Sequence, residues 1–384
     1  MRTAFLELLK GEQPDEIVWT ADISYWMEGR RRDGTYDPDW DTEEGYLRLH
    51  RRLGIFPYVY YPKFFAFAAH HDDSVRISFE QSGNVNRRRI QTPAGDLIEE
   101  STYLPESCCG ACTKHAVESA ADLDVLLYVL NHRRLIPAYL DDYAQRLSMW
   151  EAYDGVPAIG LPRSPLSCFC YEWVGVENMV YLVADHEDKV RAALQLMNRQ
   201  EEPILDAVCR AGLPVVHFPD NLTSETLTGL YDAFMAPGHR RRIGRLHEAG
   251  VCCAVHLDGA VKGLLPKLAA AGFDAVEALT PKPTGDIDMA EMRALVGSRR
   301  VILWGGVPGA MFAPPYTWDD MERHVEQLRS SWKGCPFIVG VADQVPPDGD
   351  IEFCRKIAHL LLSTPGPGGS TPRGTAATER LEPC

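Results

Sequence analysis

Two apolar runs of this chain end in side chains that could bind a metal ion. Residues 251–255 lead into His256 and Asp258, and residues 337–341 lead to Asp343. Side chains two residues apart on an extended strand point the same way and lie about 7 Å apart, which suits two ligands of one ion. An imidazole and two carboxylates suit Zn, Mn or Fe(II) without selecting among them. The pattern favours a metal site formed by these three residues.

The same residues allow two other interpretations. His256 can form an acid-base dyad with a carboxylate and no metal. It can also be a structural histidine whose ring nitrogens are satisfied by hydrogen bonds. The residue types alone leave all three open.

From residue 156 onward, short apolar segments alternate with longer segments of helical period. Continuous apolar strands separated by helices are typical of a parallel sheet that is buried on both faces. The expected strands are 156–161, 215–219, 251–257, 273–279, 301–305 and 337–341, and the expected helices are 184–211, 225–249, 260–271, 288–296 and 317–331. With 17–23 as a first strand and one further strand not located, the pattern predicts an α/β fold, a (β/α)8 TIM barrel.

The N-terminal part carries additions to this barrel. Residues 1–10 place charges among apolar positions at helical spacing and predict an amphipathic helix. Residues 75–104 alternate at period two around a Ser-Gly-Asn turn and predict a β-hairpin insertion. We expect one domain over residues 1–362, followed by a disordered tail over 363–384 that is rich in Pro and Gly.

In barrels of this kind the chemistry lies at the C-terminal ends of the strands. Asp22, Asp220 and Glu277 are acids at or near such ends, in addition to the three metal candidates. We expect Asp220 and Glu277 to be catalytic, as a general base and a substrate-orienting carboxylate, since burial beside other acids raises a carboxyl pKa toward neutrality. Asp220 can alternatively cap the helical segment that follows it.

The composition excludes several classes of function. The formal net charge of −15 opposes binding to nucleic acid or to an anionic membrane surface. No apolar run is long enough to span a bilayer, and the N-terminus lacks the apolar core of a secretory signal. The eleven cysteines are scattered, which is typical of reduced thiols. We therefore expect a cytoplasmic protein with a small-molecule substrate.

Three further patterns have ordinary interpretations. Cys109 and Cys112 have the C-x-x-C spacing of half a zinc site, but a second such pair is absent. The arginines at 240–242 and 245 are expected to form a solvated helix face. The aromatic stretch 56–67 is expected to pack in the core or in a lid.

Several short motifs resemble the uroporphyrinogen decarboxylase superfamily, over most of residues 1–362. They are Thr92-Pro-Ala-Gly, His115-Ala-Val, Asp220-Asn-Leu, Leu246-His-Glu-Ala-Gly, His256-Leu-Asp-Gly, Gly272-Phe-Asp-Ala-Val-Glu-Ala, Leu303-Trp-Gly-Gly-Val-Pro and the segment 337–348. The resemblance implies a single (β/α)8 barrel. It also implies relatives that include cobalamin-dependent methyltransferases.

Two departures from the superfamily patterns favour one branch. The decarboxylase carries an arginine-rich motif after its first strand, and residues 22–29 lack it. The methyltransferase branch holds zinc through one histidine and two cysteines. Here His256 matches the histidine, and Asp258 and Asp343 stand where the thiolates would be, which keeps the formal charge while removing the soft ligands.

The resemblance therefore implies a methyltransferase that uses a divalent metal, with Zn favoured over Mn or Fe, and a corrinoid carried by a partner protein. One alternative is a decarboxylase of a small or tetrapyrrole-like carboxylic acid, in which Asp220 or Glu277 stabilises a protonated intermediate. Another is a non-catalytic binding subunit of a corrinoid system.

Overall fold

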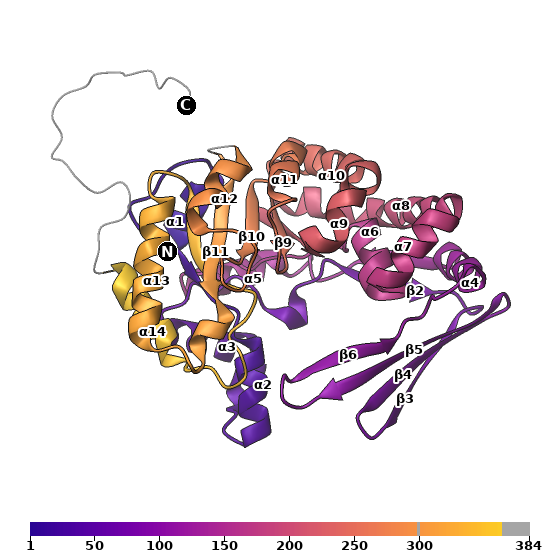
Figure 1. Cartoon of the computed structure of the whole chain (residues 1–384), viewed down its shortest axis with the longest axis horizontal. Coiled ribbons are helices and arrows are strands. Elements are labelled where there is room, and N and C mark those ends of the chain that lie inside the picture. The colour runs from indigo at the N-terminus through magenta and orange to yellow at the C-terminus, as the bar shows by residue number, and fades with distance from the viewer. Residues whose placement is uncertain (298–299, 363–384) are drawn as a thin grey trace.

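A computed structural model of the chain describes residues 1–297 and 300–362. The predicted disordered tail, 363–384, lies outside these residues. Within them the chain forms a parallel α/β sheet surrounded by helices, with a separate antiparallel sheet attached (Figure 1). The predicted fold class is confirmed.

Six parallel strands form the main sheet, in the order β1-β12-β11-β10-β9-β8. Each predicted strand from 215 onward is present. The bounds are β1 Trp19–Thr20, β8 Val215–Leu222, β9 Cys252–Leu257, β10 Ala275–Leu279, β11 Ile302–Pro308 and β12 Phe337–Ala342.

Two extended segments join the two edges of this sheet. Phe56 N donates to Trp19 O at 2.8 Å, and Val156 N donates to Pro57 O at 3.2 Å. On the other side, His217 N of β8 donates to Ile159 O at 2.8 Å. These bonds complete a circuit of eight segments, in which 56–60 is the strand that the sequence did not reveal. The aromatic stretch expected to be core or lid is therefore in part a barrel strand.

Inward-facing side chains fill the barrel. Its interior cluster includes Val18, Phe56, Ala254 and Trp304, all buried. Helix α1, Arg2–Leu9, adds Phe5, whose ring centroid lies 4.9 Å from that of Phe56 and 5.7 Å from that of Trp304. The predicted N-terminal helix is present, and it seals the barrel at the ends where the strands begin.

Helices cover the outside of the sheet (Figure 1). None in the described part of the chain is both long and apolar enough to cross a membrane. Their bounds are α2 Ser24–Asp33, α3 Glu43–Leu53, α4 Ala120–Asn131, α5 Tyr143–Glu151, α6 Pro165–Cys168, α7 Val176–Asp185, α8 Glu187–Ala211, α9 Ser224–Leu230, α10 Ala236–Glu248, α11 Leu265–Ala271, α12 Met289–Val296, α13 Trp318–Trp332 and α14 Glu352–Leu362.

The predicted hairpin is part of a larger insertion. Four antiparallel strands lie in sequence order, and Figure 1 shows them below α4 and α7, projecting from the barrel. The strands are β3 Arg76–Ser82, β4 Val85–Thr92, β5 Gly95–Leu104 and β6 Cys109–Lys114, and a small second sheet pairs β2 Phe67–His71 with β7 Arg133–Pro137. Cys109 and Cys112 lie three residues apart on β6, so they sit on opposite faces of the strand, which does not suit two ligands of one ion.

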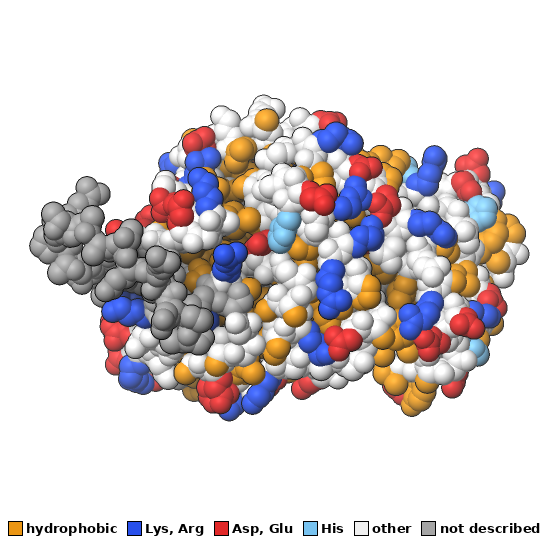
Figure 2. Space-filling view, turned by 90° about the horizontal axis from the view of Figure 1, so that it is seen from above, with side chains coloured by type: hydrophobic (Ala, Val, Ile, Leu, Met, Phe, Trp, Pro, Cys, Tyr) orange, Lys and Arg blue, Asp and Glu red, His pale blue; other side chains and the backbone are white. Residues whose placement is uncertain are grey.

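The arginines of α10 do not form a uniform solvated face. Arg241 and Arg245 form ion pairs with acids of α8. Arg242, however, is fully buried. The expectation of a solvated face is therefore wrong for Arg242, because a residue one position along a helix turns by about 100° and faces the core. On the face shown in Figure 2, basic and acidic side chains are interspersed and do not gather into patches of one sign.

Candidate functional site

A pocket of about 200 Å³ lies at the C-terminal ends of the barrel strands. Side chains from most of the eight segments converge on it, as expected for a barrel of this kind. It is lined by Asp22, Tyr58, Val59, Tyr61, Phe64, Phe65, Arg163, His217, Pro219, Asn221, His256, Glu277, Asp343 and Gln344. Three of the five predicted site residues, His256, Glu277 and Asp343, therefore share one pocket.

His256 and Glu277 form the central pair of this pocket. The two residues are register partners on β9 and β10, so their side chains stand next to each other on the same face. Nδ1 of His256 lies 2.6 Å from Oε2 of Glu277. The hydroxyl of Tyr58 donates to Oε1 of Glu277 at 3.0 Å. Within residues 1–297 and 300–362, Nε2 of His256 makes no hydrogen bond.

The pair is ionic in the folded protein. Burial alone would lower the pKa of His256, but the charge and hydrogen bond of Glu277, followed by Asp343 and Asp258, raise it to about 9. Burial would raise the pKa of Glu277, and the His256 imidazolium lowers it below its usual value. The pocket thus holds a carboxylate bound to an imidazolium when no metal ion is present.

Asp343 stands at the mouth of the pocket, with part of its surface open to solvent. Partial desolvation raises the pKa of its carboxyl to about 6, against the lowering effect of His256. Its φ of 70° lies in the left-handed region, which non-glycine residues adopt uncommonly and mostly where function or tertiary structure requires it. This conformation turns the chain directly after β12.

His217 is a functional candidate that the sequence did not reveal. Its Nε2 lies 3.7 Å from Oε2 of Glu277 and makes no hydrogen bond among the described residues. Burial lowers its pKa to about 4, with Glu277 opposing that effect. A neutral imidazole with a free ring nitrogen can accept from or donate to a substrate. Its position inside a predicted strand was the available signal, but the strand pattern does not tell which face lies inward.

Two tyrosines, Tyr58 and Tyr61, and Asp22 also line the pocket. Asp22 accepts from Tyr61 Oη at 2.5 Å and from the backbone N of Ser24 at 2.8 Å. Burial raises the pKa of Asp22, and these hydrogen bonds oppose the rise. Tyr58 and Tyr61 belong to the aromatic stretch 56–67, which was expected to pack in the core or in a lid. That expectation did not include their hydroxyl groups, which bind Glu277 and Asp22.

Arg163 supplies a cation to the pocket. Its Nη2 donates to Oδ1 of Asn221 at 2.9 Å, and its Nη1 donates to Oε1 of Glu172 at 3.3 Å. Its Nε is buried without a hydrogen-bond partner in the described structure. A guanidinium with spare donors suits a carboxylate or another anionic group on a substrate.

Asp220 does not line this pocket. Both carboxylate oxygens bind Ser164, Oδ1 to its backbone N and Oδ2 to its hydroxyl, each at 2.6 Å, and Oδ2 also lies 3.0 Å from Nε2 of His239. The residue is fully buried. Burial would raise its pKa, but His239, Arg242 and Ser164 lower it. The position does not support the expected catalytic role, because the side chain faces the surrounding helices.

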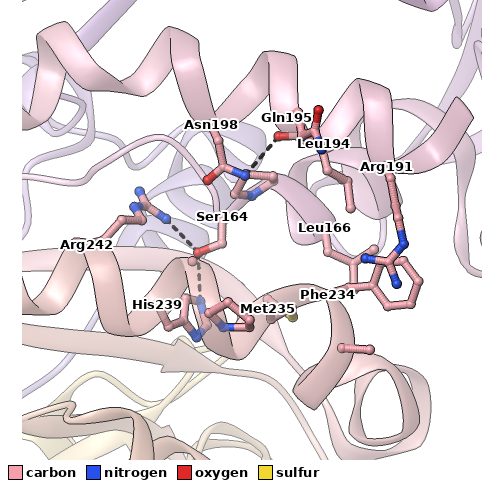
Figure 3. Close-up of a pocket in the computed structure, with 14 residues that line it drawn as sticks. Ser164, Leu166, Arg191, Leu194, Gln195, Asn198, Phe234, Met235, His239 and Arg242 are labelled. Carbon is pink, nitrogen blue, oxygen red and sulfur yellow. Dashed lines mark hydrogen bonds between the residues drawn. The ribbon is translucent and has the colours of Figure 1, made fainter. Parts of the chain in front are cut away.

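Figure 3 shows the helix side of this network. The Ser164 hydroxyl lies between Arg242, which donates to it at 2.6 Å, and His239, whose Nε2 lies 2.8 Å away. These groups border a second pocket of about 230 Å³, whose apolar lining includes Leu166, Leu194 and Met235. Ser164 directly follows Arg163 in the sequence. Arg163 lines the first pocket and Ser164 lines the second, so neighbouring residues of one segment border two different cavities.

Asp258 is exposed, and it is absent from the lining of the pocket. Its backbone N donates to Leu222 O at 2.8 Å, which fixes the chain after β9. The ligand atoms of His256, Asp258 and Asp343 do not all lie within 4.8 Å of one another. Among the residues described, the trio that meets this distance is His247, Cys253 and Asp274, near the opposite end of β9.

The donor chemistry of the pocket nevertheless fits a divalent ion. His256 offers a free Nε2 while Glu277 holds Nδ1, the arrangement in which metal-bound histidines are commonly oriented. Asp343 adds a carboxylate on the same pocket, and Asp258 lies two residues from His256. These are nitrogen and oxygen donors of the kind that Zn, Mn and Fe(II) accept.

A solved structure supports the fold. A methyltransferase from Methanosarcina mazei superposes with a TM-score of 0.58 and 14% sequence identity, covering 94% of this chain and 98% of that chain. A B12-independent methionine synthase from Shewanella sp. W3-18-1, in complex with selenomethionine, gives a TM-score of 0.47 and 10% identity, covering 91% and 98%. At 14% identity the likeness to the methyltransferase concerns the fold alone.

Sequence comparison identifies the family. No curated protein matches the chain. The family profile of uroporphyrinogen decarboxylase (URO-D) matches residues 110–360, which include six of the eight barrel segments and most of the pocket. The chain therefore belongs to the uroporphyrinogen decarboxylase family.

Proposed function

We propose that this protein is a metal-dependent methyltransferase that acts on a small-molecule substrate together with a corrinoid carried by a partner protein. The observation that carries the proposal is the His256–Glu277 pair, with Nδ1 held at 2.6 Å and Nε2 left free in the pocket. A carboxylate that fixes one ring nitrogen leaves the other as a ready metal ligand.

His256 Nε2, Asp343 and Asp258 are the residues that would hold the ion. An ion bound there would supply Lewis-acid activation of the methyl acceptor. Glu277 is a positioning residue, since it sets the ring orientation and tautomer of His256. The hydrogen bond from Tyr58 to Glu277 keeps that carboxylate in place.

Other residues of the pocket would bind and orient the substrate. Arg163 presents a cation with an unpaired Nε. His217 presents a neutral ring with an unpaired Nε2, at the centre of a buried strand. Phe64 and Phe65 supply apolar surface on the same pocket, which excludes water from part of it.

Metal analysis of protein purified without chelator tests the ion. We expect His256→Ala and Asp343→Ala each to lose one equivalent of metal relative to the unmodified protein. Asp348→Ala is the matched control, because Asp348 is exposed and lies five residues beyond Asp343, outside the pocket. Equal metal content in all four proteins would exclude the proposed ligands.

Methyl transfer is tested with methylcobalamin and candidate acceptors, followed by the absorbance of the cobalt centre. We expect demethylation that depends on His256. Corrinoid binding without transfer to any acceptor would instead favour a non-catalytic binding subunit.

One observation favours a second candidate, a decarboxylase of a small carboxylic acid. The pocket holds two cationic groups, Arg163 and the His256 imidazolium, which suit a substrate carboxylate. Release of CO2 from candidate acids, with activity that survives removal of metal, would favour this reaction over methyl transfer.

A further inference from the structure

A second group of metal-competent side chains lies near the N-terminal end of β9. His247 is in the last turn of α10, Cys253 is the second residue of β9, and Asp274 directly precedes β10. One ligand atom from each of the three lies within 4.8 Å of the other two. Cys253 is three residues before His256, so the two sites are about 10 Å apart along the strand.

The fold brings these three residues together. Ala254 and Ala275 are register partners, so Cys253 and Asp274 are the next pair along the neighbouring strands. The turn between α10 and β9 is short and is closed by a hydrogen bond from Val251 N to Leu246 O at 2.9 Å. Gly250 within it has a φ of 75°, which suits glycine. This turn places His247 beside the starts of both strands.

Asp274 is the centre of the group. Its Oδ2 lies 2.8 Å from Nε2 of His247 and accepts from the backbone N of Cys253 at 2.7 Å. Its Oδ1 makes no hydrogen bond to another described residue. The thiol of Cys253 makes a long contact of 3.9 Å to Val251 O. One carboxylate oxygen and the thiol sulfur are therefore free to bind an ion.

The surroundings favour a cation. The C-terminal end of α10 carries the partial negative charge of the helix, which stabilises positive charge near His247. The His247 side chain is 41% exposed and that of Asp274 is 32% exposed, which leaves a path from solvent. Cys253 is buried, which protects the sulfur from oxidants.

We propose that His247, Cys253 and Asp274 bind a zinc ion that ties the end of α10 to the starts of β9 and β10. Imidazole nitrogen, thiolate sulfur and carboxylate oxygen are the three ligand types of protein zinc sites, and a water molecule completes the tetrahedron. The thiol proton leaves to solvent when the ion binds. This site is separate from the pocket and does not depend on the proposed methyl transfer.

Cobalt(II) titration of the reduced full-length protein tests the site. Co²⁺ bound to a thiolate gives a charge-transfer absorbance. The pocket that contains His256 has no cysteine in its lining, so Co²⁺ bound there would not give this absorbance. We expect this absorbance in the unmodified protein and its loss in Cys253→Ala. Cys252→Ala is the matched control, because the thiol of Cys252 contacts Leu9 O instead. His256→Ala, which removes the proposed catalytic ligand, should keep the absorbance.

A second measurement covers the case in which Cys253→Ala does not fold. His247→Gln changes a half-exposed residue, and we expect it to fold and to lose the absorbance. Zn²⁺ should raise the Tm of the unmodified protein by about 5 °C and leave that of His247→Gln unchanged.

Two results would overturn the proposal. One is the absence of thiolate absorbance in the folded unmodified protein, which would leave His247 and Asp274 as a simple ion pair. The other is an absorbance that persists in Cys253→Ala or His247→Gln. If the unmodified protein shows the Co²⁺–thiolate absorbance but no methyl transfer, that result would count against the proposed function and not against this zinc site.

Discussion

Nδ1 of His256 lies 2.6 Å from Oε2 of Glu277, and the two residues are paired across neighbouring parallel strands. The backbone register therefore sets the distance between them. An ion pair built on two strands is held more rigidly than one built on loops. The rigidity matters because metal-binding histidines need a fixed ring orientation.

Replacement of Glu277 by Gln should weaken metal binding without removing a ligand. Gln lacks the negative charge that holds the His256 ring through Nδ1, and weakening a partner that orients a metal-binding histidine costs about 10-fold to 100-fold in metal affinity. Competition with a chromogenic chelator measures the effect. Tyr58→Phe keeps the carboxylate and should change affinity less. An affinity of Glu277→Gln equal to that of the unmodified protein would show that Glu277 does not orient the ligand.

Asp220→Ala should destabilise the protein and leave metal content unchanged. The substitution leaves His239 and Ser164 buried without the carboxylate that binds them, and removing one partner of a buried ion pair costs about 3 to 5 kcal/mol. Urea unfolding measures the change. Asp258→Ala, at an exposed position, should cost little stability but reduce metal binding. A stable Asp220→Ala enzyme with lost activity would restore a catalytic role for Asp220.

Acidification should destabilise the protein in part through His50. Burial lowers the pKa of this histidine to about 4, with hydrogen bonds to Tyr46 O and Ala21 O opposing the shift. The unfolded chain takes up the proton below about pH 6.5 and the folded chain does not, so stability falls as pH drops from about 6.5 toward 4.

The loss from His50 alone is on the order of 2 kcal/mol at pH 5. Chemical unfolding at pH 7.5 and pH 5 measures it in the unmodified protein and in His50→Gln, whose side chain does not titrate. The difference between the two proteins isolates His50 from His217, whose pKa is also lowered. Parallel curves for both proteins would contradict the expectation.

Arg163→Met should raise KM for an anionic substrate about 10-fold or more, because the substitution removes a charged hydrogen-bond donor from the pocket. The stem of methionine keeps much of the packing. Arg191→Met is the control, since Arg191 lines the second pocket and stacks on Phe234. Steady-state kinetics with the identified substrate measures both variants. Equal KM values would place the substrate away from Arg163.

The alternation of strands and helices was readable in the sequence because buried parallel strands are continuous apolar runs. The strand at 56–60 was not, since it contains Pro57 and two tyrosines. In the structure its aromatic rings fill the barrel beside Trp304, and the ring centroids of Tyr58 and Trp304 are 4.7 Å apart.

The site was only partly predictable. Strand ends identified His256, Glu277 and Asp343, because the C-terminal ends of barrel strands meet at one mouth. The pairing of His256 with Glu277 could not be predicted, because the sequence of a strand does not show its register with the neighbouring strand. Asp220 also lies near the end of a strand, but His217, Pro219 and Asn221 of β8 line the pocket, and alternation along the strand turns Asp220 to the other face.

The same alternation limits how this region of the chain can change over evolutionary time. Arg163 and Asn221 face the pocket, whereas their sequence neighbours Ser164 and Asp220 face the helices. Single substitutions at the pocket positions can therefore alter specificity while the scaffold contacts persist. Insertion or deletion of one residue near 163 or 220 would exchange the two faces, so new specificities should arise here by replacement and not by change of loop length.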